Sequence, residues 1–241
     1  MAEAGEKTSS EAVPSEGFEF YAPERFTPEQ MKERLASLEN VLAGRRSVRH
    51  FSPNPVPMDV LESAIRIASS APSGAHKQPW TFCIVTDPKL KASIREAAER
   101  EELISYTSRM SERWLADIKF TGTDHVKPFI EEAPALIIVF KRLYELDDQP
   151  APTKAPNYYV PESVGIATGF LLVALQQAGL AALTHTPSPM NFLGKLLGRP
   201  ENERAFLNIP VGWPASDAEV PIIRRKSMAE VMVKYPGSEE E

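Results

Sequence analysis

One apolar stretch without charged residues, at positions 165–183, restricts the folds open to this chain more than any other feature. A charge-free stretch of this length is also what a membrane-spanning helix requires. Gln176 and Gln177 lie inside it, however, and Gly179 follows them at a position suited to ending a helix. We therefore expect a helix that is buried in a protein core, stops at Gly179 and is followed by a short strand.

Helices and strands are interleaved along the chain, but without the even period of a doubly wound parallel sheet. Helices are expected over residues 28–43, 57–70, 88–105, 111–118, 125–132, 161–178 and 190–197, and strands over 80–85, 135–140, 181–185 and 206–211. Thr27 followed by Pro28 is a helix-start signal. The glycine motifs of dinucleotide-binding and phosphate-loop proteins are absent from the sequence.

The 241 residues favour one sizeable domain, which we place at residues 21–235. Residues 1–20 and the acidic tail over 236–241 are expected to be flexible, and residues 141–160, which carry several prolines, are expected to form a loop. Residues 1–20 lack the apolar segment that secretion needs, so we expect a soluble, cytoplasmic protein that does not bind membranes. The formal net charge of -6 argues against a nucleic-acid surface.

Despite this negative balance, positive charge is concentrated in two short runs, residues 45–49 (Arg-Arg-Ser-Val-Arg) and 224–226 (Arg-Arg-Lys). Guanidinium groups bind phosphate oxygens with bidentate geometry, and a serine hydroxyl adds a further donor. If folding brings the two runs together, they could bind one compact dianion. Two solvated helix ends are the alternative, because cations are common there.

The spacing of histidines and cysteines predicts no metal site. The histidines are His50, His76, His125 and His185. No two of them have the spacing that places a pair of ligands on one helix face. Cys83 is the only cysteine, and it falls in an expected strand, so we expect it to be a small buried hydrophobe.

A segment of small residues follows the helix expected over 57–70. It contains Ser73, Gly74 and Ala75, but it lacks the Gly-x-Ser-x-Gly motif of a nucleophilic serine. Gly74 and Ala75 leave their backbone N–H groups open to a flat or anionic ligand. A connecting loop made of turn residues is the alternative.

Glu102, Tyr106 and Lys127 form a further candidate group. Glu102 and Tyr106 are four residues apart in an expected helix and so share one face. With Lys127 folded over the same site, the group could hold an amino-acid zwitterion. Several charged residues surround Glu102, so a solvated helix face is the alternative. After an expected strand, Thr184 and Thr186 could direct hydroxyls into a site or could simply mark the strand end.

Taken in this order, the segments resemble the nitroreductase-like flavoprotein superfamily and, within it, the iodotyrosine deiodinase family. The resemblance covers residues 18–233, through segments at 45–49, 71–76, 79–82, 109–114, 197–200 and 210–212. The Arg-Arg-Ser and Pro-Ser-Gly segments are typical of the superfamily, whereas the spacing of Glu102, Tyr106 and Lys127 is specific to the deiodinases. The resemblance implies an α+β nitroreductase-like fold, with a mixed central sheet flanked by helices, in an intertwined homodimer that binds FMN at the subunit interface.

The resemblance also implies a role for each candidate residue. The residues implied in FMN binding are Arg45, Arg46, Ser47, Val48, Arg49, Ser73, Gly74, Thr184, His185, Thr186 and Arg225. Ser73 and Gly74 would approach the FMN of the partner subunit, and the Thr186 hydroxyl would be the catalytic group near flavin N5. Glu102, Tyr106 and Lys127 would bind the substrate zwitterion. The Ala75 backbone N–H would meet the phenolate oxygen.

The implied reaction is FMN-dependent reductive dehalogenation of a halotyrosine, with NAD(P)H or a reductase as the electron source. A general NAD(P)H-dependent nitroreductase or flavin reductase is one alternative, and a non-catalytic flavin-binding protein is another. The sequence also departs from the animal deiodinases. His185 stands where a small hydroxyl residue is expected, residues 187–197 are short relative to those enzymes, and their membrane anchor is missing.

Overall fold

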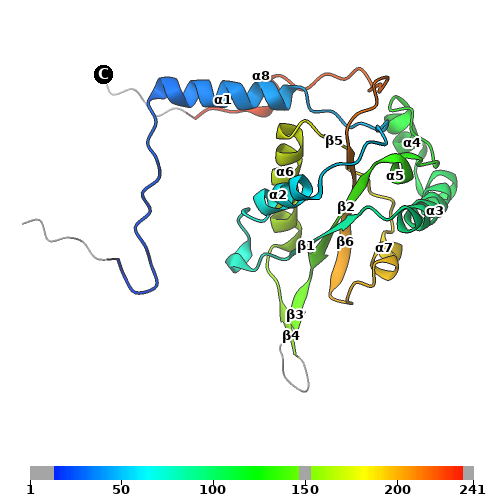
Figure 1. Cartoon of the computed structure of the whole chain (residues 1–241), viewed down its shortest axis with the longest axis horizontal. Coiled ribbons are helices and arrows are strands. Elements are labelled where there is room, and N and C mark those ends of the chain that lie inside the picture. The colour runs from blue at the N-terminus through cyan, green and yellow to red at the C-terminus, as the bar shows by residue number, and fades with distance from the viewer. Residues whose placement is uncertain (1–13, 147–152, 236–241) are drawn as a thin grey trace, which may run out of the picture. The chain divides into compact units, whose positions relative to one another are not determined.

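The computed structural model describes residues 14–146 and 153–235 (Figure 1). Outside the described residues lie the tail expected over 236–241, residues 1–13 of the segment expected to be flexible, and residues 147–152 of the expected loop. The single domain expected over residues 21–235 and the flexibility of its flanks stay predictions.

The chain divides into two compact units, Met1–Asn40 and Val41–Glu241. Helix α1 (Pro28–Ala43) begins in the first unit, where the Thr27 start signal acts as expected. The Thr27 hydroxyl accepts a hydrogen bond from the Gln30 backbone N–H at 3.3 Å, and the Thr27 N–H donates to the Gln30 side chain at 2.9 Å. These reciprocal bonds satisfy donors that the first helical turn leaves free.

The second unit is built on a four-stranded sheet with the strand order β1-β2-β6-β5 (Figure 1). The strands are β1 (Trp80–Val85), β2 (Ala135–Arg142), β6 (Glu203–Gly212) and β5 (Ala181–Ala182). Every strand pair in this sheet is antiparallel. In the described part of the chain, the parallel pairing of the expected mixed sheet is limited to one isolated bridge, between Ser47 and Ala182.

Strand β2 is buried on both faces, which explains its unbroken apolar sequence. Ala135, Ile137 and Val139 enter one hydrophobic core, and Leu136, Ile138 and Phe140 enter a second core on the opposite face. A strand covered on both sides shows a continuous apolar run instead of alternation, so such a sequence marks a central strand. The strand expected over 135–140 is confirmed and continues to Arg142.

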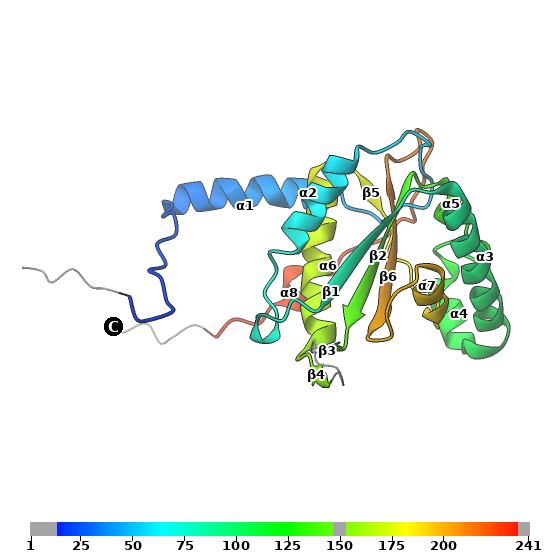
Figure 2. The same ribbon diagram turned by 60° about the horizontal axis from the view of Figure 1, so that its bottom comes forward.

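Helices cover the two faces of the sheet (Figure 2). One core contains α2 (Met58–Ala68) and α6 (Val160–Gln177), and the other contains α3 (Pro88–Ile104), α5 (Phe129–Glu132) and α7 (Asn191–Leu196). Helix α4 (Glu112–Lys119) follows α3 on the same side of the sheet (Figure 2). The helices expected at these places and the strands expected over 80–85 and 206–211 are confirmed, with α5 shorter than expected.

Helix α6 is the buried helix that the charge-free stretch predicts. Val164, Leu171 and Leu175 each have 0% exposed surface. Gly179 follows the helix with a φ of 75°, a left-handed conformation that glycine adopts at little cost, and the chain then enters β5. None of the helices described has the length and apolarity needed to cross a membrane.

Three expected elements differ in extent. The helix expected over 125–132 is reduced to α5, because Pro128 disfavours helical geometry at the residue before it. The loop expected over 141–160 contains an antiparallel hairpin, formed by β3 (Tyr144–Leu146) and β4 (Lys154–Pro156). The strand expected over 181–185 is limited to β5, followed by an isolated bridge at His185. A short helix, α8 (Met228–Val231), was not expected.

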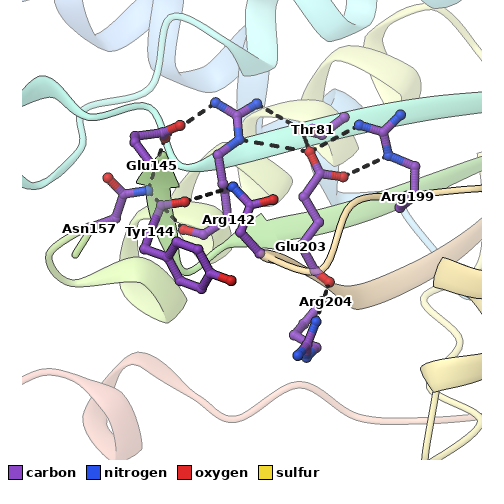
Figure 3. Close-up of polar contacts among 9 residues, drawn as sticks. Thr81, Arg142, Tyr144, Glu145, Asn157, Arg199, Glu203 and Arg204 are labelled. Atoms are coloured by element: carbon purple, nitrogen blue, oxygen red, sulfur yellow. Dashed lines mark hydrogen bonds and ion pairs between the residues drawn. The ribbon is translucent and has the colours of Figure 1, made fainter. Parts of the chain in front are cut away.

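A buried carboxylate, Glu203, ties the start of β6 to β1 and β2 (Figure 3). Its side chain is 2% exposed and lies 3.7 Å from Arg142 on β2. It accepts hydrogen bonds from Arg199 at 2.7 and 3.0 Å and from the Thr81 hydroxyl at 2.6 Å. Burial by itself raises the pKa of Glu203, but the Arg199 and Thr81 donors hold that pKa below its ordinary value.

We expect Glu203→Gln to lower the free energy of unfolding near neutral pH by about 1–3 kcal/mol, because two guanidinium groups lose their shared carboxylate. Since the pKa of Glu203 is lower in the folded chain than in the unfolded chain, its contribution is lost as the pH falls through the folded value. Urea titrations at about pH 7 and about pH 3 should therefore show a difference that narrows on acidification.

The matched control is Glu201→Gln, because the Glu201 side chain is 75% exposed. This exposed change should alter the free energy of unfolding by less than about 0.5 kcal/mol. Equal losses in the two variants would contradict the role assigned to Glu203.

Candidate active site

The two cationic runs, distant in the sequence, meet in the folded chain. Arg225 donates to the backbone carbonyls of Ala43 and Arg45, each at 3.0 Å. Arg46 in turn donates to the carbonyl of Pro221. The prediction that the two runs come together is therefore confirmed, and they are not two separate solvated helix ends.

A cavity of about 210 Å³ opens beside this junction. Its lining residues are Arg45, Arg46, Ser47, Arg49, Phe120, Thr121, Pro221 and Ile223. Three guanidinium groups and two hydroxyls thus face one space, a donor set that fits a phosphate dianion. Arg225 is not among these residues, and its guanidinium instead donates to the backbone carbonyls of Ala43 and Arg45.

The run 45–49 is fixed to the sheet through its middle residues. Ser47 forms the parallel bridge to Ala182, and the Val48 N–H donates to the Ala182 carbonyl at 3.4 Å. The Val48 side chain is buried in the core on the α3 side of the sheet. Two adjacent residues at the middle of the run are therefore held against the sheet, and the arginines on either side of them line the cavities.

A second cavity, of about 170 Å³, joins the candidate zwitterion group to the threonines. Its lining residues are Arg49, Glu102, Tyr106, Met110, Trp114, Ile118, Thr123, Lys127, Phe129, Leu183, Thr184, His185 and Thr186. Arg49 lines both cavities, so the cationic run and the zwitterion group border neighbouring cavities.

Glu102 and Lys127 form a buried ion pair in this cavity. Lys127 Nζ lies 3.4 Å from Glu102 Oε2, and the two side chains are 3% and 9% exposed for Lys127 and Glu102. Lys127 Nζ also donates to the Thr123 hydroxyl at 3.0 Å. Burial raises the pKa of Glu102, but His185 and Lys127 outweigh it and hold that pKa below its ordinary value. The alternative of a solvated helix face is therefore wrong for Glu102.

Tyr106 lies in a π-helical turn, Ser105–Arg109, that continues α3. Such turns are rare and occur frequently at functional sites. The Tyr106 ring lies 5.4 Å from Lys127 Nζ, and its hydroxyl donates to the Thr123 carbonyl at 3.3 Å. Burial raises the pKa of Tyr106, so its hydroxyl stays protonated at neutral pH. The three residues expected to act together are thus brought together.

The side chains of residues 184–186 point in two directions. His185 exchanges backbone hydrogen bonds with Asn208 on β6 at 2.9 and 3.0 Å, so the segment is extended and its side chains alternate. Thr184 and Thr186 are exposed, whereas His185 is 8% exposed and packs edge-on against Phe129. All three residues line the second cavity, where the His185 side chain is directed at Glu102 on α3, and their contact with a flavin stays a prediction.

Ser73, Gly74 and Ala75 lie in another place, on the α2 and α6 side of the sheet (Figures 1 and 2). The Gly74 N–H donates to the Ser163 hydroxyl at 3.2 Å, and a Cβ on Gly74 would lie 2.7 Å from the Tyr158 carbonyl oxygen. Ala75 has a left-handed φ of 49°, which costs energy for a residue other than glycine. Among the residues the structure describes, none of these three lines either cavity.

Several cavity residues were not expected from the sequence. Met110, Trp114 and Ile118 form an apolar wall opposite the threonines, and Phe120 and Thr121 line the cationic cavity. Trp114 and Ile118 are four residues apart on α4, so their shared helix face could have indicated these two residues as part of the cavity wall. No group of histidine, cysteine and acidic side chains in the described ranges could hold a metal ion.

This fold and this site define a flavoprotein-type oxidoreductase scaffold, and the comparison with protein families agrees. Residues 42–213 match the nitroreductase family. The chain therefore belongs to the nitroreductase family, and the fold class predicted from the sequence is confirmed.

Within that family, the chain is similar to iodotyrosine deiodinases over most of its length. It is 57% identical over 215 residues to the iodotyrosine deiodinase of Haliscomenobacter hydrossis, which covers 89% of this chain and 96% of that relative. It is 41% identical over 214 residues to iodotyrosine deiodinase 1 of Homo sapiens, covering 88% of this chain and 73% of the human protein. The resemblance drawn from the sequence motifs is thus confirmed.

Solved structures show the same relationship. A crystal structure of oxidized iodotyrosine deiodinase bound to FMN and 3-iodo-L-tyrosine has a TM-score of 0.68 and 33% identity, covering 83% of this chain and 99% of that chain. The FMN-dependent nitroreductase NfnB from Mycobacterium smegmatis, solved with NADPH, has a TM-score of 0.64 at 19% identity, covering 84% of this chain and 100% of that chain. At that identity the second likeness concerns the fold alone.

We expect Glu102→Gln and Lys127→Met to be strongly non-additive. Each single change leaves a buried charge without its partner and should lower the free energy of unfolding by about 3 kcal/mol. The double variant removes both charges and should be less destabilised than the sum of the two, by about 1–3 kcal/mol. Urea titrations of the four proteins give this coupling energy.

The exposed pair Glu96 and Arg100 on α3 provides the matched control. Its own cycle, with Glu96→Gln and Arg100→Met, should give a coupling below about 0.5 kcal/mol. A buried-pair coupling as small as that of the exposed pair would contradict the ion pair described for the site.

Proposed function

We propose that the protein is an FMN-dependent oxidoreductase that reductively dehalogenates halotyrosines. The observation that carries the proposal is the pair of neighbouring cavities that share Arg49, one cationic and the other containing the buried pair of Glu102 and Lys127. The similarity to iodotyrosine deiodinases, one of them solved with FMN and 3-iodo-L-tyrosine, supports the assignment.

The residues around the first cavity suit FMN. Arg45, Arg46 and Ser47 would bind its phosphate, since their guanidinium and hydroxyl groups face one space beside a backbone braced by Arg225. Val48 holds this run to the sheet. Bound FMN supplies the two electrons that the reaction consumes. Thr184 and Thr186 are exposed next to the site, and we assign the Thr186 hydroxyl the contact with the reactive edge of the flavin.

The second cavity suits the amino-acid end of the substrate. A halotyrosine brings an ammonium for Glu102 and a carboxylate for Lys127, so its binding replaces one buried ion pair with two and keeps the charges balanced. Tyr106 lies beside Lys127 and can cover the bound zwitterion. With the site closed, water is excluded from the reacting bond.

The net reaction replaces a carbon–halogen bond with a carbon–hydrogen bond. It consumes two electrons and one proton and releases the halogen as a halide ion. NAD(P)H or a separate reductase is the proposed source of the electrons. Negative charge develops on the phenol oxygen of the halotyrosine during the reaction. A backbone N–H can stabilise that charge by donating a hydrogen bond to the oxygen. We assign this donor to Ala75.

A homodimer follows from the position of that donor. Ser73, Gly74 and Ala75 lie on the α2 and α6 side of the sheet and line neither cavity of their own protomer. We propose that each protomer contributes this segment to the site of its partner. The strained backbone at Ala75 and the close fit of Gly74 against Tyr158 keep the segment rigid for that purpose.

The single cysteine, Cys83, fits the reducing cytoplasm that we propose as the location.

Anaerobic turnover tests the proposed function. FMN-loaded protein reduced with dithionite should convert 3-iodotyrosine to tyrosine and iodide in equal amounts, as measured by chromatography and an iodide electrode. The same preparation of Glu102→Gln should lose about 100-fold in kcat/KM for 3-iodotyrosine, because the ammonium loses its buried counterion. Absence of tyrosine and iodide with the unmodified chain would remove the proposal.

Nitroaromatic reduction is the control reaction, because a nitroaromatic acceptor has no zwitterion. Glu102→Gln should leave it within about threefold of the unmodified chain, and the exposed change Glu96→Gln should leave both reactions within that range. Equal loss of both reactions in Glu102→Gln would contradict the role of Glu102 in binding the substrate zwitterion.

A further inference from the structure

Few buried polar atoms of the described residues lack a hydrogen bond, and most of these atoms lie beside the active site. They belong to three side chains, Asn157, His185 and Asn208. His185 lacks a partner at both ring nitrogens, and Asn208 lacks one at both ends of its amide. His185 and Asn208 are direct antiparallel partners, so their side chains stand on the same face of the sheet.

The His185 ring is directed at the carboxylate that is proposed to bind the substrate. Its Nε2 lies 3.4 Å from Glu102 Oε1, while Lys127 lies 3.4 Å from the other oxygen, Oε2. The two oxygens of Glu102 thus face different partners. Because Lys127 is proposed to bind the substrate carboxylate, His185 is the group that remains beside Glu102 after substrate binds.

The charges around His185 favour the neutral ring. Burial lowers the pKa of His185 most, and Lys127 and Arg49 lower it further. Glu102 opposes them, but the pKa stays below its ordinary value. The other titratable group of the cavity is Tyr106, which is uncharged because burial raises its pKa. Asn208 offers a free amide donor to the second ring nitrogen, which would leave Nε2–H directed at Glu102.

We propose that His185 is a positioning residue that holds Glu102 for the substrate ammonium, so that the affinity for halotyrosine depends on the charge of His185. The inference rests on the proposed function and assigns this ring a role away from the flavin. A neutral His185 ring donates one N–H to the Glu102 carboxylate. The negative charge of Glu102 then stays available to the substrate ammonium. A protonated ring neutralises Glu102 and repels the ammonium in the same cavity.

The sign of the pH effect follows from this geometry. Because His185 is neutral above its pKa, substrate affinity should be full near neutral pH and should fall as the pH drops through that pKa. Each pH unit below the pKa weakens binding by up to about tenfold. A side chain that donates a hydrogen bond without titrating should abolish this dependence and keep the affinity at high pH.

Binding of 3-iodotyrosine to the FMN-loaded chain tests the proposal, followed by the change in flavin fluorescence between about pH 8 and about pH 5. His185→Asn keeps an amide donor but cannot titrate. It should bind within about threefold of the unmodified chain at the upper pH, and the unmodified chain should lose more affinity than this variant on acidification. Titration of the substrate phenol is common to both proteins and cancels in the ratio of their affinities.

The matched control is His50→Asn, which removes an exposed histidine and should keep the steep pH profile. Parallel profiles for His185→Asn and the unmodified chain would overturn the proposal. Weak binding of His185→Asn at every pH with an unchanged slope would overturn it too, because that result indicates a structural role only.

A second readout needs no halotyrosine. The His185 ring protons can be followed by NMR during a pH titration of the FMN-loaded chain. Glu102→Gln should move the His185 midpoint to lower pH, because the carboxylate that raises the pKa is gone. An unchanged midpoint would overturn the contact. A shifted midpoint in a chain that binds no halotyrosine would instead contradict the proposed function and support the contact.

Discussion

The hydrogen bonds from Arg225 to the carbonyls of Ala43 and Arg45 are the contacts on which the arrangement of the site depends. They tie the C-terminal segment to the backbone that precedes the cationic run. The Ser47 bridge to β5 then fixes the run against the sheet. With its backbone held from both sides, the run projects Arg49 between the two cavities, and a chain of net negative charge acquires one strongly positive site.

The sheet divides the proposed chemistry between its two faces. The cationic cavity and the zwitterion cavity form on the side of α3, whereas the segment with Ser73, Gly74 and Ala75 lies beside α6. Strand β2 separates the two cores and is buried on both faces. In the function that we propose, a second protomer supplies this segment, and that is the physical reason for the proposed homodimer.

Much of the fold could be predicted from local sequence. The absence of charge over residues 165–183 predicted the buried helix α6, and the apolar run over 135–140 predicted the strand β2. The spacing of Glu102 and Tyr106 placed them on one helix face. The junction of the two cationic runs was predicted from charge alone, because arginines clustered twice in an acidic chain indicate one shared anionic ligand.

Other features depend on contacts between distant segments and were not predicted. The burial of Lys127 depends on its pairing with Glu102 across the fold, and Lys127 precedes α5 because that helix begins only after Pro128. The inward direction of His185 depends on its register with Asn208 in β6. The hairpin β3–β4 was not predicted, because the prolines in residues 141–160 indicated a loop. For Lys127 and His185 the deciding partner is far away in the sequence, where local patterns carry no information.

A comparison of FMN with riboflavin tests the central claim most directly, because the two ligands differ only in the phosphate. Fluorescence titrations at one fixed ionic strength should show FMN binding at least about 100-fold more tightly than riboflavin. Arg46→Gln should remove most of that difference and leave riboflavin binding unchanged. Equal affinities for the two ligands in the unmodified chain would contradict the account.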